Sequence, residues 1–248
     1  MDAYGLFYLV KDNMERARAY LSAYTRAGYS LTLVVDRRAS QQKGETVKRR
    51  EHVRAEAKAA VQSLHDVVES AAFQDLSPQE QAVLQRRLHQ KEAEAWHFSP
   101  ALLERYKILC RELTIQLEFA DEEADTALAA GVHAGLWDII VSGDSDLLLL
   151  RVPRLWIFTA RADCVKEIVY TEFLRFMCLT GDQVVTLALL AGSDVSPRPI
   201  CSISQAVSWL RYYGSLEAIH ARLPEQLTCE DMVRWKEIAP LYLSTATV

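Results

Sequence analysis

Acidic side chains follow two short apolar runs of this chain, and carboxylates are the groups best suited to hold a divalent metal ion. Residues 31–35 run into Asp36, and residues 138–141 are followed closely by Asp144 and Asp146. Carboxylates at the ends of parallel strands converge at one edge of the sheet, where ligands bind in open α/β folds. Like charges gathered there repel one another unless a cation holds them, so this pattern predicts a divalent metal site.

Two further acidic groups lie between and beyond these runs, and each also has an ordinary structural explanation. One is the cluster at 121–125, where Asp121 would cap a helix and acids are favoured in the first turn. The other is Asp194, which follows an apolar helix in the sequence Gly-Ser-Asp. The metal-binding interpretation rests on all four groups occurring together, in this order, with basic residues directly after Asp36.

The spacing of Asp144 and Asp146 allows two structural interpretations. If the backbone is extended at this point, the two side chains point to the same side and share a ligand. Alternatively, Asp144 is a turn residue or the cap of a helix that starts near Leu147.

Composition is ordinary for a globular protein, but charge is unevenly distributed. The chain has 248 residues and a formal net charge of −5, so bulk charge gives no reason to expect nucleic acid. Residues 37–58, however, hold eight basic side chains and three acids, whereas residues 111–151 hold two basic side chains and nine acids. This asymmetry suits a protein that holds a metal in one place and a polyanion in another.

The five cysteines form no CxxC pair, and the sequence shows no zinc-finger spacing and no signal peptide. Scattered cysteines indicate free thiols in a reducing compartment. We therefore expect an intracellular protein, with the nucleus as the first choice and the mitochondrion as the alternative.

Hydrophobic patterning predicts an α/β fold with a parallel sheet. We expect a helix over 3–27, strands at 31–35, 114–119, 138–141 and 155–159, and helices at 101–112 and 122–134. Alternating strands and helices imply βαβ units. The polar stretch from Gly44 to Lys91, broken at Ser77-Pro78, is too polar for a core, and we interpret it as a helical excursion over the sheet edge. The remaining segments, 171–179, 181–191, 204–213 and 216–223, are expected to be helical, as is the C-terminal segment.

Three sequence blocks resemble those of the flap endonuclease and XPG-type 5′ nucleases, with the exonuclease branch the most similar. They begin with Glu-Ala-Asp at 123–125, Asp-Ser-Asp-Leu-Leu at 144–148 and Leu-Leu-Ala-Gly-Ser-Asp at 189–194. The resemblance implies a PIN-like nuclease domain over 1–160 with a helical arch at about 43–110, and a C-terminal helical region over 161–248 that resembles a helix-two-turn-helix unit.

The same resemblance implies roles for individual side chains. The metal ligands would be Asp36, Glu123, Asp125, Asp144, Asp146 and Asp194, which would bind two Mg²⁺ ions, with Mn²⁺ as a substitute. Lys43 and Arg49 match the pair that steers the scissile phosphate. Neighbouring basic residues would contact nucleic acid or, alternatively, form an exposed helix face paired with glutamates; they are Arg37, Arg38, Lys48, Arg50 and Arg54.

This sequence departs from the family's pattern in two places. Relatives open with a strand that ends in another metal-binding aspartate, and we expect this strand and ligand to be absent here. Relatives also carry a Gly-x-Gly hairpin after the last acid, whereas residues 200–205 have serines in its place. Missing glycines hinder close approach of the backbone to phosphate, which bears on whether the protein is active. The first hypothesis is an active Mg²⁺-dependent nuclease acting on DNA in replication or repair, and the second is a nuclease-like nucleic-acid-binding protein without turnover. A third, with less support, is a phosphatase or RNase.

Overall fold

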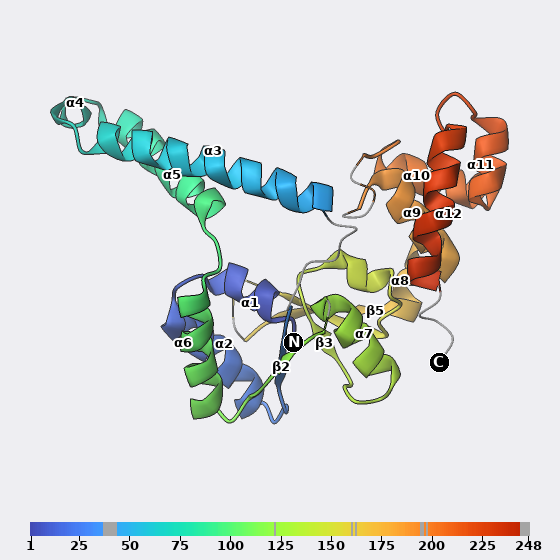
Figure 1. Ribbon diagram of the computed structural model, residues 1–248, viewed down its shortest axis with the longest axis horizontal. Helices are drawn as coiled ribbons and strands as arrows, with labels where there is room; N and C mark the ends of the chain where they lie inside the picture. Colours follow the sequence, from blue (N-terminus) through green and yellow to red (C-terminus); the bar gives the residue numbers. More distant parts are fainter. Residues whose placement is uncertain are drawn as a thin grey trace. The chain divides into compact units, whose positions relative to one another are not determined.

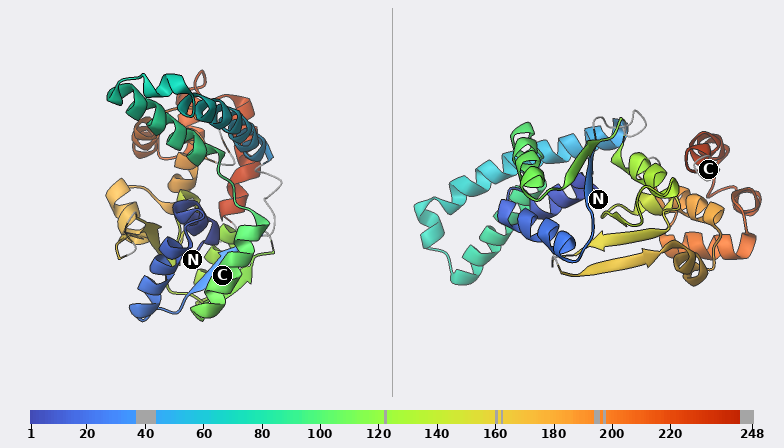
Figure 2. Two further views of the ribbon diagram at one scale, coloured as in Figure 1. Left: turned by 90° about the vertical axis from the view of Figure 1, so that its left-hand side faces the viewer. Right: turned by 90° about the horizontal axis from the view of Figure 1, so that it is seen from below.

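The computed structural model describes residues 1–36, 44–121, 123–159, 161, 163–193, 196 and 198–243 (Figures 1 and 2). The chain divides into two compact units, Met1–Gln41 with Ala101–Val248, and Gln42–Pro100. Lys43, Arg37, Arg38 and Asp194 lie outside the described residues. Of the predicted site residues that the structure describes, the acidic ones lie in the larger unit and the basic ones lie in the smaller unit.

The sheet of the larger unit consists mostly of parallel strands, as predicted. Strand β1 (Thr32–Val35) pairs in parallel with β2 (Gln116–Phe119), and β3 (Ile140–Val141) pairs in parallel with β4 (Arg154–Phe158). The two pairs are joined by Met1 and Asp2, since the Val34 N–H donates to the Met1 carbonyl and the Asp2 N–H donates to the Val141 carbonyl, each over 2.9 Å. The predicted α/β, PIN-like architecture is confirmed.

An additional strand, β5 (Val165–Val169), was not predicted. It pairs antiparallel with β4, and the two strands run side by side (Figure 2, right). Its exposed, charged sequence, Val-Lys-Glu-Ile-Val, lacks the continuous apolar run of a buried parallel strand. An antiparallel edge strand needs only one covered face, so its hydrophobic signal is weak.

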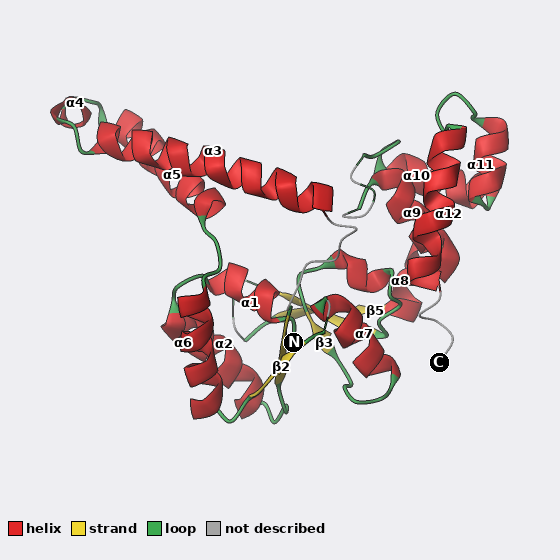
Figure 3. Ribbon diagram, viewed as in Figure 1, coloured by secondary structure: helices red, strands yellow, loops and turns green. Residues whose placement is uncertain are grey.

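Helices enclose these strands (Figure 3). The first predicted helix is in fact two, α1 (Ala3–Val10) and α2 (Met14–Arg26), because Lys11 adopts φ 51° and Asn13 caps α2 by accepting from the Arg16 N–H at 2.9 Å. Two more helices flank β2 in the chain: α6 (Pro100–Glu112) precedes it and α7 (Ala124–His133) follows it. Leu33, Val34 and Val35 are buried beneath them, which explains why this strand was readily recognised.

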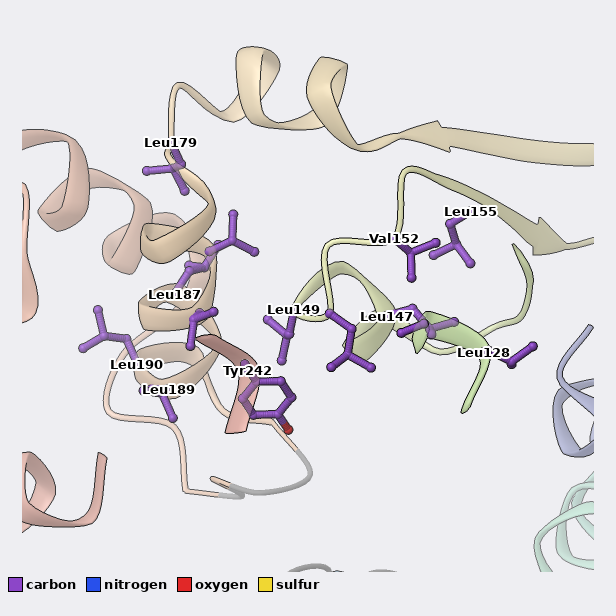
Figure 4. Close-up of a cluster of buried hydrophobic side chains, with 14 of the residues drawn as sticks. Leu128, Leu147, Leu149, Val152, Leu155, Leu179, Leu187, Leu189, Leu190 and Tyr242 are labelled. Atoms are coloured by element: carbon purple, nitrogen blue, oxygen red, sulfur yellow. The ribbon is translucent and has the colours of Figure 1, made fainter. Parts of the chain in front are cut away.

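The C-terminal helices continue the hydrophobic core of the larger unit. They are α8 (Tyr170–Met177), α9 (Gly181–Ala191), α10 (Ile203–Tyr213), α11 (Leu216–Arg222) and α12 (Cys229–Leu243). Leu187, Leu189 and Leu190 of α9 belong to the same buried cluster as Leu147 and Leu155 (Figure 4). Of the described helices, no single one is long and apolar enough to cross a membrane, and only α8 and α9, bent by 69°, meet the length and composition as a pair.

The smaller unit is a helical hairpin with a thin core. It comprises α3 (Gly44–Val68), the short α4 (Ala71–Gln74) and α5 (Pro78–Ala95). The predicted break at Ser77 is confirmed: Ser77 caps α5 in a capping box with Glu80, and Pro78 is at the first helical position. His65 and Glu92, 3.3 Å apart, join α3 to α5. The placement of this helical hairpin over the sheet edge stays a prediction, and so do the domain boundaries.

Candidate functional site

A hydrogen-bond chain through the buried side chain of Ser142 links Asp2, which lies between β1 and β3, to the turn that follows β3. Ser142, which follows β3 and is 0% exposed, donates from Oγ to Oδ2 of Asp2 over 2.8 Å. The same Oγ accepts from the Asp144 N–H over 3.0 Å. Asp2 is itself buried, which raises the pKa of its carboxyl, and the nearby charge of Asp144 raises it further. Hydrogen bonds from the Gly5 backbone and Ser142 oppose this shift.

The segment after Ser142 forms a turn, so the extended backbone that would place Asp144 and Asp146 on one side is wrong here. Asp144 caps the short 3₁₀ helix η2 (Ser145–Leu148) and accepts from the Asp146 N–H over 2.8 Å. The turn is favoured because it places the side chain of Leu147 in the core, where it is fully buried. Asp144 and Asp146 both remain half-buried, at the end of β3.

Asp36 lies at the corresponding end of β1 and contacts the start of α7. Its Oδ1 accepts a hydrogen bond from the N–H of Ala124, the first residue of that helix. Glu123, at the N-cap position, and Asp125, in the first turn, flank Ala124. The predicted cap, Asp121, does not start the helix. The first N–H of α7 instead donates to Asp36, which directly follows β1.

Asp2 is a candidate site residue that sequence reasoning missed. We expected the family's N-terminal strand and its metal-binding aspartate to be absent. In the structure, Met1 and Asp2 lie between β1 and β3 and bring a carboxylate to the sheet, and the role of that carboxylate as a metal ligand is proposed below. One signal was available: Asp2 stands directly before an apolar helix. With a single residue ahead of it, however, no strand pattern marks it.

The acids therefore gather as two close groups at the carboxyl ends of neighbouring strands, Asp2 with Asp144, and Asp36 with the start of α7. Among the residues that the structure describes, no three His, Cys, Asp or Glu side chains are arranged to hold a metal ion by themselves. Mg²⁺ keeps several waters and is usually bound through one or two carboxylates. The donor set, carboxylate oxygens in pairs, fits such an ion.

The predicted phosphate-contacting residues that the structure describes lie on α3, in the smaller unit. Lys48 and Arg49 are exposed, and Arg54 is half-buried, whereas the side chain of Arg50 is outside the described part. Glu56, which we expected as a partner for the basic side chains, lies 3.3 Å from His52. An exposed row of cations suits contact with a polyanion.

The segment that replaces the family's glycine hairpin leads into a helix. Ser202 caps α10, its side chain accepting from the Gln205 N–H over 3.3 Å. The serines expected to hinder phosphate approach thus include one with a structural role in starting α10.

Comparison with known proteins places the fold. Residues 114–194 match the model of the XPG I-region. No curated protein sequence matches the chain. The structure is similar to the catalytic core of Rad2 in complex with DNA substrate, with a TM-score of 0.59 and 16% identity over 96% of this chain and 67% of that one.

Two further solved structures are similar in fold to this chain. Human GEN1 in complex with Holliday junction DNA has a TM-score of 0.53 and 13% identity, over 92% of this chain and 53% of that one. The bacteriophage T5 flap endonuclease, in a pseudo-enzyme-product complex with DNA and metal ions, has a TM-score of 0.51 and 14% identity, over 98% and 85%. The chain spans about half to two thirds of the Rad2 and GEN1 chains it matches.

Proposed function

Because residues 114–194 carry the XPG I-region and the chain has the fold of XPG-type nucleases, we propose that this protein is a divalent-metal-dependent nuclease that hydrolyses phosphodiester bonds of DNA. The finer assignment is a 5′ flap endonuclease or 5′–3′ exonuclease acting in replication or repair in the nucleus. The observation that carries the proposal is the grouping of Asp2 with Asp144 after β3, and of Asp36, at the end of β1, with the start of α7.

The proposed metal ligands are the acids of these groups together with Asp194. Bound Mg²⁺ ions, a pair in this family's chemistry, would supply Lewis acidity and an activated water. Asp2, Asp36, Glu123, Asp125, Asp144 and Asp146 would hold the ions directly or through water. Mutual repulsion among these carboxylates is what a bound dication would relieve.

Basic side chains are proposed to contact the DNA backbone. Lys43 and Arg49 would offset charge on the phosphoryl oxygens of the scissile bond. The other cations would bind neighbouring phosphates in a salt-dependent and sequence-independent way; they are Arg37, Arg38, Lys48, Arg50 and Arg54. The similar structures of Rad2, GEN1 and the T5 flap endonuclease were solved in complex with DNA, which supports DNA as the partner.

A second candidate function is a nucleic-acid-binding protein with this fold but without turnover. It is favoured by the serines at 200–205, where close backbone approach to phosphate would need glycine. It predicts retained DNA binding without cleavage.

One experiment separates the two functions. Pure protein is incubated with end-labelled 5′-flap, nicked and blunt duplexes, first with Mg²⁺ and then with chelator. We expect metal-dependent cleavage that disappears in the double variant Asp144→Ala/Asp146→Ala while DNA binding persists. Cleavage that survives in the double variant would contradict the assigned site, and binding without cleavage by the wild type would favour the second function.

A further inference from the structure

The hydroxyl group of Ser142 is fully buried between the carboxylate of Asp2 and the backbone N–H of Asp144. Ser142 follows β3 directly, and its own backbone N–H donates to the Trp156 carbonyl of β4 over 3.0 Å. Its Oγ lies 2.8 Å from Oδ2 of Asp2 and 3.0 Å from the backbone nitrogen of Asp144. The backbone of Ser142 is thus held by β4, and the two contacts of Oγ define the direction of the hydroxyl.

The chemistry of the three groups determines the direction of each hydrogen bond. A backbone N–H only donates, so Ser142 Oγ must accept from Asp144. A serine hydroxyl has one proton, and that proton is left for Oδ2 of Asp2. One neutral side chain thus ties a carboxylate at the chain's second residue to the turn that carries Asp144 and Asp146.

The carboxylate of Asp2 is closely packed against Gly5. A Cβ atom at Gly5 would lie 2.5 Å from Oδ2 of Asp2 and 2.8 Å from the Phe158 ring. Glycine at position 5 therefore leaves the room that the Asp2 carboxylate occupies beside the hydroxyl of Ser142.

We propose that Ser142 is a positioning residue for the metal site, holding the Asp2 carboxylate and the Asp144 turn in register before a divalent ion binds. This inference rests on the proposed function and deepens it. Hydrogen-bond partners of ligating carboxylates typically account for about 10- to 100-fold in metal affinity. Ser142 acts through Asp2 and Asp144 and does not touch substrate.

The test measures Mn²⁺ binding to the full chain by loss of the free-ion electron paramagnetic resonance signal, alongside the Mg²⁺ dependence of cleavage. For Ser142→Ala we expect Mn²⁺ affinity to fall by about 10-fold or more, and the Mg²⁺ concentration for half-maximal cleavage to rise in parallel. Ser142→Thr, which keeps the hydroxyl, should restore most of the affinity. If its extra methyl disturbs packing, Ser142→Cys should fall between wild type and Ser142→Ala.

Ile140→Val is the matched control, because Ile140 is fully buried in β3, two residues before Ser142, and its aliphatic side chain can form no hydrogen bond to a carboxylate. It should lower stability and leave Mn²⁺ affinity unchanged. A folded Ser142→Ala protein with wild-type Mn²⁺ affinity, or an affinity loss equal to that of Ile140→Val, would overturn this inference and leave the proposed function standing. No Mn²⁺ binding by the wild type would overturn both.

Discussion

The carboxylate of Asp36 accepts a hydrogen bond from the backbone N–H of Ala124, although the two residues are 88 positions apart in the chain. One side chain therefore starts helix α7 and stands beside Glu123 and Asp125. Asp36 therefore has a structural role in addition to the metal-binding role proposed for it. Substitutions that separate cap from charge can distinguish them.

Asp36→Asn keeps an oxygen acceptor for Ala124 but removes the negative charge. We expect stability close to wild type and weakened Mn²⁺ binding. Asp36→Ala should lose both, with a stability cost of about 0.5–2 kcal/mol, as for a lost helix cap. Urea unfolding and Mn²⁺ titration of the two variants check this, and equal Mn²⁺ affinity in Asp36→Asn and wild type would remove Asp36 from the ligand set.

Asp2 gives the metal-free protein a predicted pH dependence. Burial raises the pKa of its carboxyl above the usual 3.8, so the folded state binds more protons than the unfolded state between these two values. Its contribution to stability is therefore greatest at low pH and is lost as pH rises through that window. Asp2→Asn removes this pH dependence.

The measurement is the free energy of unfolding against pH in chelator, for wild type and Asp2→Asn. The difference should grow in favour of Asp2→Asn as pH rises above about 4, by roughly 1.4 kcal/mol for each pH unit of that window. Added Mg²⁺ should stabilise the wild type more than the variant. Parallel curves at every pH would show that Asp2 titrates normally.

Gly5 and Gly143 form a matched pair of glycines near the candidate site. A methyl group at Gly5 would clash with the Asp2 carboxylate, whereas nothing lies within 4 Å of a Cβ at Gly143. Gly5→Ala should cost about 1–3 kcal/mol through overpacking and weaken metal binding. Gly143→Ala should stay within about 0.5 kcal/mol of wild type. Thermal unfolding and Mn²⁺ titration decide, and a tolerated Gly5→Ala would argue against the close packing of Asp2.

The cysteines should differ in reactivity although all five are free. Burial raises the pKa of Cys110 to about 11, so little thiolate forms there near neutral pH. Cys164, Cys178 and Cys229 are exposed. Alkylation followed by mass spectrometry should label these three first and Cys110 only on unfolding. Early labelling of Cys110 in the native protein would contradict its burial in α6.

Local signals made much of the architecture predictable from sequence. The apolar run before Asp36 identified β1, and Ser77-Pro78 identified the start of α5, because a cap and a proline at the first helical position are a local signal. The start of α7 was misplaced in the prediction, because the side chain that accepts from its first N–H is Asp36, which follows β1 and lies far away in the sequence. The edge strand β5 was missed because one covered face leaves only a weak pattern.

The order and spacing of Asp36, Glu123, Asp125, Asp144 and Asp146 were determined by the sequence alone, and so was the prediction of a metal-binding nuclease. Only the tertiary structure decided which of these acids meet and that Asp2 joins them. The physical reason is that the contacts between Ser142 and Asp2, and between Asp36 and Ala124, join positions 140 and 88 residues apart. Such contacts depend on strand pairing and packing, which no local pattern of residues specifies.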